Sequence, residues 1–221
     1  MFKLIHDVLD PAAVGELRKI AAAANFVDGR VSNPHSKVKN NLQLHEQKPA
    51  ERATAILANG LLSNPEFFAF AFPKAIAPPI LTRYDPGMRY GVHPDSALMQ
   101  LPTGPLRSDL SCTIFLSDPN SYEGGALRIV LGSAELRFRG PAGSAIVYPS
   151  NTLHEVEAVT SGSRLVGLTF IQSRIADPAR RELLYELNEV AALEGNNMQP
   201  ENYTRLQMVQ YNLTRQWVDA P

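Results

Sequence analysis

The sequence predicts an α+β protein with a mainly β core, a jelly roll, and N-terminal and C-terminal helices packed on it. Helix-start signals, Asp10-Pro11 and Asp177-Pro178, stand near the two ends of the chain. Between residues 76 and 175, short β-prone runs alternate with turn residues, which is typical of sandwiches and barrels. The 221 residues, 44% hydrophobic and 19% charged, fit one globular domain of generous size.

Residues 1–75 are expected to be a helical and loop support region. Asp10 can cap a helix over residues 10–24, where apolar residues recur at helical spacing. Residues 25–47 are polar and broken by glycine and proline, so we predict a loop or a loosely paired strand there. A second helix is expected from Pro49, and a short helical turn from Asn64-Pro65.

Residues 76–175 are expected to form the roll. Glycine, proline and aspartate clusters separate seven candidate strands. The β-prone runs are 79–84, 111–116, 126–131, 134–138, 144–148, 154–159 and 165–172. Seven or eight short strands within about 100 residues suggest two sheets rather than one.

Residues 176–221 are expected to be a helical extension. One helix begins at Asp177-Pro178 and ends near Gly195, and a second follows it. Each helix carries an apolar stripe. The stripe residues are Leu183, Leu184, Leu187, Val190 and Ala191, then Leu206, Val209, Leu213 and Trp217. Two interpretations remain open, namely packing on the roll and a homodimer contact.

Composition excludes several classes of protein and site. A net charge of −1 argues against nucleic acid as the main partner, because a polyanion binder needs an excess of Lys and Arg. The sequence shows no signal peptide and no membrane span, so a cytoplasmic protein is expected. The single cysteine, Cys112, excludes multi-cysteine metal sites and suggests a buried, inert thiol. A metal would therefore need histidine and carboxylate ligands.

Three residues in the predicted roll fit such a site. His93 and Asp95 stand two positions apart beyond a strand, so in an extended chain both point to the same side. This pair alone is a weak signal. His154 stands at the start of another β-prone run and is the third candidate ligand. Two histidines and one carboxylate form the facial triad of non-haem Fe(II) oxygenases.

Arg164 is the fourth candidate. It begins the run after His154, so a hairpin would place it beside the metal strand. A guanidinium inside an apolar barrel needs an anion, and its planar fork suits a carboxylate. That anion could be the distal carboxylate of 2-oxoglutarate.

With these residues in order, the chain resembles the Fe(II)- and 2-oxoglutarate-dependent dioxygenases of the prolyl 4-hydroxylase type. More narrowly, it resembles the bacterial PKHD-type hydroxylases. The resemblance covers nearly the whole chain. Further matching stretches are 27–30, 38–41, 83–84, 116–119, 124–127, 147–150 and 180–184.

The resemblance implies a double-stranded β-helix, iron ligands at His93, Asp95 and His154, and 2-oxoglutarate held by Arg164. It also implies O2 and an unidentified peptidyl or small-molecule substrate as partners, release of succinate and CO2, and L-ascorbate as a possible reductant. Animal prolyl hydroxylases place a tyrosine beside the distal carboxylate, whereas the counterpart here is Phe115. We expect Tyr84 or Tyr148 to supply that hydroxyl.

Two other functions remain open from the residues alone. One is a cupin-like metalloenzyme that does not use 2-oxoglutarate and so has no need of Arg164. The other is a non-catalytic, iron-sensing or binding barrel. Around Lys39 and Asn41, the polar run before the roll is expected to help cover the substrate entrance.

Overall fold

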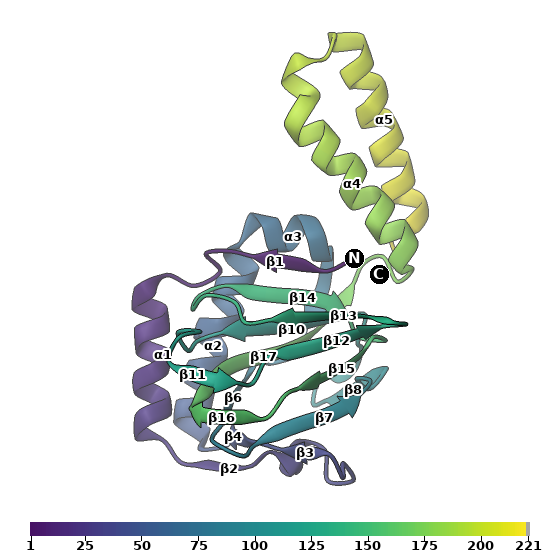
Figure 1. Cartoon of the computed structure of the whole chain (residues 1–221). Coiled ribbons are helices and arrows are strands. Elements are labelled where there is room, and N and C mark those ends of the chain that lie inside the picture. The colour runs from purple at the N-terminus through teal and green to yellow at the C-terminus, as the bar shows by residue number, and fades with distance from the viewer. Residues whose placement is uncertain (220–221) are drawn as a thin grey trace.

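The computed structural model describes residues 1–219, in which two β-sheets face each other and helices cover the outer side of the larger sheet (Figure 1). The larger sheet runs β1-β14-β10-β17-β6-β4-β2, and β5 also pairs with β17. Its strands are Lys3–Ile5 (β1), Phe26–Asp28 (β2), Leu42–Leu44 (β4), Pro73–Ile76 (β5), Ile80–Tyr84 (β6), Leu110–Phe115 (β10), Ala145–Pro149 (β14) and Arg164–Ser173 (β17).

The smaller sheet runs β13-β12-β15-β7-β3 and closes the roll. Its strands are Ala134–Phe138 (β13), Leu127–Leu131 (β12), Leu153–Val156 (β15), Arg89–His93 (β7) and Lys39–Asn40 (β3). Two further strand pairs complete the β structure of the described residues. One is the hairpin of Leu98–Leu101 and Gly104–Arg107 (β8, β9), and the other joins Tyr122–Gly124 to Val159–Gly162 (β11, β16). The predicted α+β jelly roll is confirmed.

Strand β10 shows how the sequence pattern builds two cores. All six of its residues are buried, because helices cover one face and the second sheet covers the other. Leu110, Cys112 and Ile114 belong to the cluster that packs against the helices, and Phe115 belongs to the cluster between the sheets. Alternate residues of a strand point to opposite faces, so one strand supplies both cores.

Helices α1 (Pro11–Ala23), α2 (Gln47–Ser63) and α3 (Pro65–Ala71) form the N-terminal support. Asp10 accepts a hydrogen bond from the Ala13 amide and Asn64 accepts one from the Phe67 amide, so both predicted N-caps are present. Leu17, Leu57 and Phe67 are fully buried against the larger sheet. The three helices therefore anchor one face of the roll.

Residues 25–47 are more ordered than a loop. They form β2, a 3₁₀ turn at Gly29–Ser32, β3 and β4, and we call this segment the N-terminal strap. Its strand partners in β6 and β7 lie between 39 positions (Gln43 and Thr82) and 51 positions (Lys39 and Tyr90) later in the chain. This pairing with distant strands holds the segment in β structure, although its polar, glycine- and proline-containing sequence is typical of a loop.

The predicted run 154–159 is also divided. Residues Leu153–Val156 join the smaller sheet as β15, whereas Val159–Gly162 pair with β11. The chain thus changes sheet between these two strands.

Helices α4 (Pro178–Glu194) and α5 (Pro200–Trp217) form a hairpin that projects from the roll (Figure 1). In α4 only Arg181, Leu184 and Tyr185 are buried, and α5 has no buried residue. The packing on the roll is thus confined to the start of α4, less than predicted, and the stripe residues Leu183, Val190 and Val209 are exposed. Within residues 1–219, none of the helices has the length and apolarity that a membrane crossing requires.

Candidate active site

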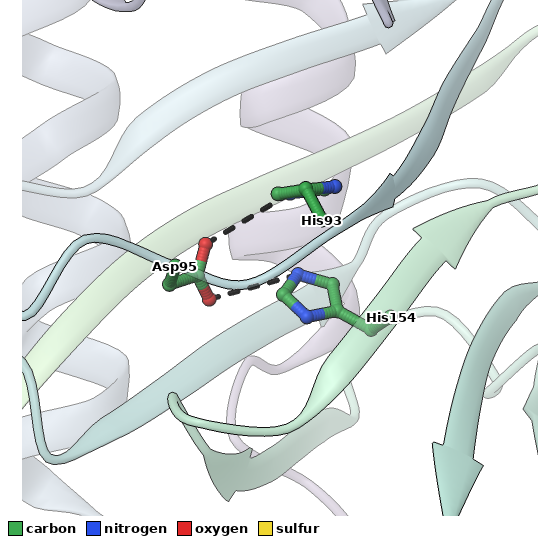
Figure 2. A group of neighbouring side chains, drawn as sticks. All are labelled: His93, Asp95 and His154. Carbon is green, nitrogen blue, oxygen red and sulfur yellow. Dashed lines mark ion pairs between the residues drawn. The ribbon is translucent and has the colours of Figure 1, made fainter.

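His93, Asp95 and His154 converge at one end of the smaller sheet. Strands β7 and β15 pair antiparallel with His93 directly opposite His154, and Asp95 follows two residues after His93. Their ligand atoms lie within 4.8 Å of one another. Figure 2 shows the Asp95 carboxylate facing both imidazole rings, 3.9 Å from His93 Nε2 and 3.6 Å from His154 Nε2. The fold therefore brings together the three residues that the sequence singled out.

Both histidines present the same nitrogen to this cluster. His93 Nδ1 lies 2.7 Å from the Gly91 carbonyl oxygen, and His154 Nδ1 lies 2.9 Å from the Thr152 carbonyl oxygen. A carbonyl can only accept, so each Nδ1–H donates and each neutral ring keeps its lone pair on Nε2. Burial and the neighbouring His154 lower the pKa of His93, which favours this neutral form.

A chain of serines holds the carboxylate. Ser111 Oγ donates to Asp95 Oδ2 over 2.5 Å and lies 2.8 Å from Ser150 Oγ. Ser108 Oγ donates to Ser150 Oγ over 2.8 Å. Such outer partners orient ligands in metal sites. Sequence analysis missed Ser111, although its position on the interior face of the run 111–116 was available as a signal.

Aromatic rings pack against both histidines. Tyr90 stacks on His93 with ring centroids 3.6 Å apart and an interplanar angle of 14°. Tyr148 meets His154 edge-on with centroids 5.1 Å apart. Burial raises the pKa of Tyr148 well above its usual value, so its hydroxyl stays protonated.

Arg164 is buried inside the roll at 1% exposure. It pairs with Tyr84 across β17 and β6, and its guanidinium carbon lies 5.1 Å from the Tyr84 ring centroid. Among the hydrogen bonds of residues 1–219, none involves the side-chain nitrogens of Arg164. Buried polar groups are nearly always paired, so these donors point to a missing anion.

Thr82 is a second orphan in the same interior, and sequence analysis missed it. Its hydroxyl is fully buried without a partner in the described part of the chain. Thr82 stands two residues before Tyr84 on β6, so both side chains face the roll interior. Across the strands Thr82 pairs with Val166, which stands two residues after Arg164 on β17. Strand parity predicts that Thr82 faces the interior, but it does not predict that the hydroxyl lacks a partner.

The N-terminal strap contributes two more side chains. Asn41 is buried, and its Nδ2 donates to the Tyr84 hydroxyl over 2.9 Å. Lys39 is buried beside Tyr90, and its Nζ donates to Ser32 Oγ over 2.7 Å. The strap therefore forms a wall of the site, and its predicted role in covering the substrate entrance stays a prediction.

The other histidines lie outside this cluster. His6, His35 and His45 are exposed, and within residues 1–219 the group of His93, Asp95 and His154 is the only one that could hold a metal by this geometry. Cys112 is buried, and burial raises the pKa of its thiol far above the usual range. It faces the helices rather than the site.

Comparison with known proteins decides the family. Residues 79–172, which contain all four predicted functional residues, match the model of the 2OG-Fe(II) oxygenase superfamily. A PKHD-type hydroxylase of Sphingopyxis alaskensis is 61% identical over 217 residues, which cover 98% of this chain and 99% of the relative. The chain belongs to the PKHD-type hydroxylase family. A PKHD-type hydroxylase of a Janthinobacterium species is 40% identical over 96% of this chain and 97% of its own.

Solved structures similar to this PKHD-type hydroxylase share its fold. A prolyl hydroxylase from Trichoplax adhaerens aligns with a TM-score of 0.60 and 14% identity, over 82% of this chain and 86% of its own. A prolyl-4-hydroxylase from Pseudomonas putida aligns with a TM-score of 0.54 and 18% identity, over 78% and 92%. The predicted family, fold and oxygenase class are thus confirmed. The family favours 2-oxoglutarate chemistry over a cupin-like enzyme or a non-catalytic barrel.

Proposed function

We propose that His93, Asp95 and His154 bind Fe(II) and that Arg164 binds the distal carboxylate of 2-oxoglutarate in a hydroxylase of this family. One observation carries the proposal. A two-histidine, one-carboxylate cluster opens into the same interior as a buried arginine without a hydrogen-bond partner in the described chain. Together they match the two ends of a metal-chelating dicarboxylate.

The residues present fit both groups. The donor set of two imidazole nitrogens and one carboxylate oxygen suits Fe(II). The Arg164 fork suits a carboxylate, which would satisfy donors that are otherwise costly to bury. When both are bound, they supply the oxidising chemistry, in which O2 is consumed, a substrate is hydroxylated, and succinate and CO2 are released.

This chain's own residues position the reactants. Ser111 holds Asp95, and the Gly91 and Thr152 carbonyls orient the two rings. The Tyr84 ring supports Arg164, whose stem also passes close to Gly125, where a Cβ would lie 3.1 Å from Arg164 Cδ. The surrounding apolar core excludes water and so strengthens each polar contact.

We propose Thr82 as a further hydroxyl beside Arg164. Tyr84 and Tyr148 were the residues expected from the sequence. The Tyr84 hydroxyl accepts a hydrogen bond from Asn41 and keeps its own proton to donate, and Tyr148 packs against His154. The Thr82 hydroxyl has no partner in residues 1–219 and lies on the strand face beside Arg164. Tyr84 and Tyr148 remain predicted partners of the 2-oxoglutarate carboxylate, and Thr82 joins them as a further hydroxyl.

The test is anaerobic addition of Fe(II) and 2-oxoglutarate, followed by succinate measurement in air. We expect a weak visible charge-transfer band that needs both additions, and succinate release that is lost in His93→Ala and Asp95→Ala. Succinate release that persists without iron in these variants would overturn the proposal.

The finer expectations from the sequence remain predictions. They are L-ascorbate as a reductant, a cytoplasmic location, no nucleic-acid or membrane partner, and the division at residues 75 and 175. A homodimer through the C-terminal helices also remains a prediction. It is supported by exposed apolar side chains on the projecting hairpin, such as Leu183, Leu193 and Met208. Sedimentation of the full chain would measure it.

A further inference from the structure

Lys39 is a buried cation that lacks an anionic partner. Its side chain lies on the N-terminal strap and the residue is 8% exposed. Nζ donates to Ser32 Oγ, and in residues 1–219 it has no ion pair within 4.0 Å. An ammonium carries three donors, so two remain for a ligand. Burial lowers the pKa of Lys39 to about 8, as expected for a desolvated ammonium.

Lys39 lies at the metal site. It pairs with Tyr90 across β3 and β7, and Nζ lies 5.5 Å from the Tyr90 ring centroid. That ring stacks on His93 at 3.6 Å. The ammonium and the proposed metal ligand therefore contact the same aromatic ring, which places a free cation beside the reaction centre.

The nearby carboxylates are already engaged. Asp28 is exposed and held by the Arg30 guanidinium and backbone amide. Asp95 accepts from Ser111 and faces His93 and His154. Neither lies within ion-pair distance of Lys39 in the described chain. Within residues 1–219, Lys39 thus has no carboxylate as its counterion.

We propose that Lys39 binds a carboxylate of the substrate, so that the enzyme hydroxylates a carbon close to a carboxylate group. This inference rests on the proposed function, because it takes the neighbouring cluster as the reaction centre. The distal carboxylate of 2-oxoglutarate is assigned to Arg164, which lies inside the roll on β17. Lys39 instead lies on β3, the edge strand of the smaller sheet.

The first test is direct binding of simple probes to protein loaded with Zn(II) and 2-oxoglutarate, which cannot turn over. Lysine side chains carry a ¹³C label, and the Lys39 signal is assigned from its absence in Lys39→Gln. Propionate and benzoate are titrated at constant ionic strength, with propionamide and benzamide as matched neutral probes. We expect a saturable shift of the Lys39 signal and a rise in its pKa with the acids alone. An unmoved signal, or equal binding of the amides, would overturn the inference.

The second test measures which small molecules accelerate succinate release. A bacterial small-molecule extract is separated on an anion exchanger, and each fraction is added to the Fe(II)-loaded enzyme. We expect stimulation by the retained fraction, lost when its carboxylates are esterified, and reduced about 10- to 100-fold in Lys39→Gln. Lys39→Arg should restore part of it. Lys37→Gln, which removes an exposed lysine two positions earlier, should respond like the wild type.

The outcomes separate the two proposals. Stimulation by the unretained fraction, or an equal response of Lys39→Gln and wild type, would overturn the role of Lys39. If no fraction stimulates, the ¹³C titration decides. If the wild type shows no charge-transfer band with Fe(II) and 2-oxoglutarate, the proposed function is overturned instead. The ¹³C titration would still report whether Lys39 binds carboxylates. Lys39→Gln should melt no lower than the wild type, because it removes a buried unpaired charge, and it should keep its 2-oxoglutarate affinity, which separates loss of binding from unfolding.

Discussion

Arg164 lies over the ring of Tyr84, with its guanidinium carbon 5.1 Å from the ring centroid, and among residues 1–219 its nitrogens have no hydrogen-bond partner. This pairing supports the guanidinium from one side and leaves its donors for a ligand. Burying an arginine without a partner has a large free-energy cost, which a bound anion would offset. The unpartnered, buried guanidinium therefore supports the proposed role of Arg164 in binding an anion.

Replacing Arg164 by methionine should weaken 2-oxoglutarate binding about 10- to 100-fold, because charge-assisted hydrogen bonds are lost. Calorimetry with the Zn(II)-loaded protein measures the affinity. Arg83→Met is the matched control, since Arg83 on the neighbouring strand faces the other way and pairs with Asp85. Equal affinity in Arg164→Met and wild type would contradict this role.

Each of His93→Ala, Asp95→Ala and His154→Ala should abolish stable Fe(II) binding, because two ligands hold the ion far more weakly than three. Metal content after desalting measures the loss. His45→Ala removes an exposed histidine outside the cluster and should retain iron. A His154→Ala protein with full iron content would show that the cluster is not the metal site.

Ser111→Ala should lower the metal affinity about 10-fold, because the Asp95 carboxylate loses the hydroxyl that orients it. Competition with a chelator of known affinity measures the change. Ser133→Ala, in an exposed turn, is the control and should bind metal as the wild type does. An unchanged affinity in Ser111→Ala would mean that Ser150 and the backbone suffice to hold Asp95.

Gly29→Ala should destabilise the protein by about 1–3 kcal/mol, because a Cβ there would lie 1.8 Å from Asn41 Oδ1. Displacing Asn41 also removes its hydrogen bond to the Tyr84 hydroxyl, so 2-oxoglutarate affinity should fall as well. Gly15→Ala is the opposite case. It lies in α1 with no atom within 4 Å, so alanine should stabilise by about 0.5–1 kcal/mol. Urea unfolding of both variants measures whether the free energy of unfolding falls in Gly29→Ala and rises in Gly15→Ala.

The Cys112 thiol should resist modification in the native protein. It is buried, and burial raises its pKa, so almost no thiolate is present at pH 8. A colourimetric thiol reagent should react slowly in buffer and within seconds in denaturant. Rapid reaction of the native protein at pH 8 would show that the strand carrying Cys112 opens readily.

Local patterns in the sequence determined the elements that depend on neighbouring residues. Asp10, Asn64 and Asp177 each cap a helix where the sequence predicted one, because a cap needs only residues three positions away. The His93 and Asp95 pair was also readable, since strand geometry places residues two apart on one side. The order of the functional residues along the chain further revealed the family.

Tertiary structure alone decided what depends on distant segments. The register of β7 and β15 places His93 opposite His154, and the strap reaches β7 from far earlier in the chain to bring Lys39 beside Tyr90. No local signal marks Thr82 as an orphaned hydroxyl, because its environment comes from β6, β17 and the strap together. The projecting C-terminal hairpin was likewise beyond sequence reasoning. An apolar stripe shows that a helix needs a partner, whereas only the packed chain shows which partner it finds.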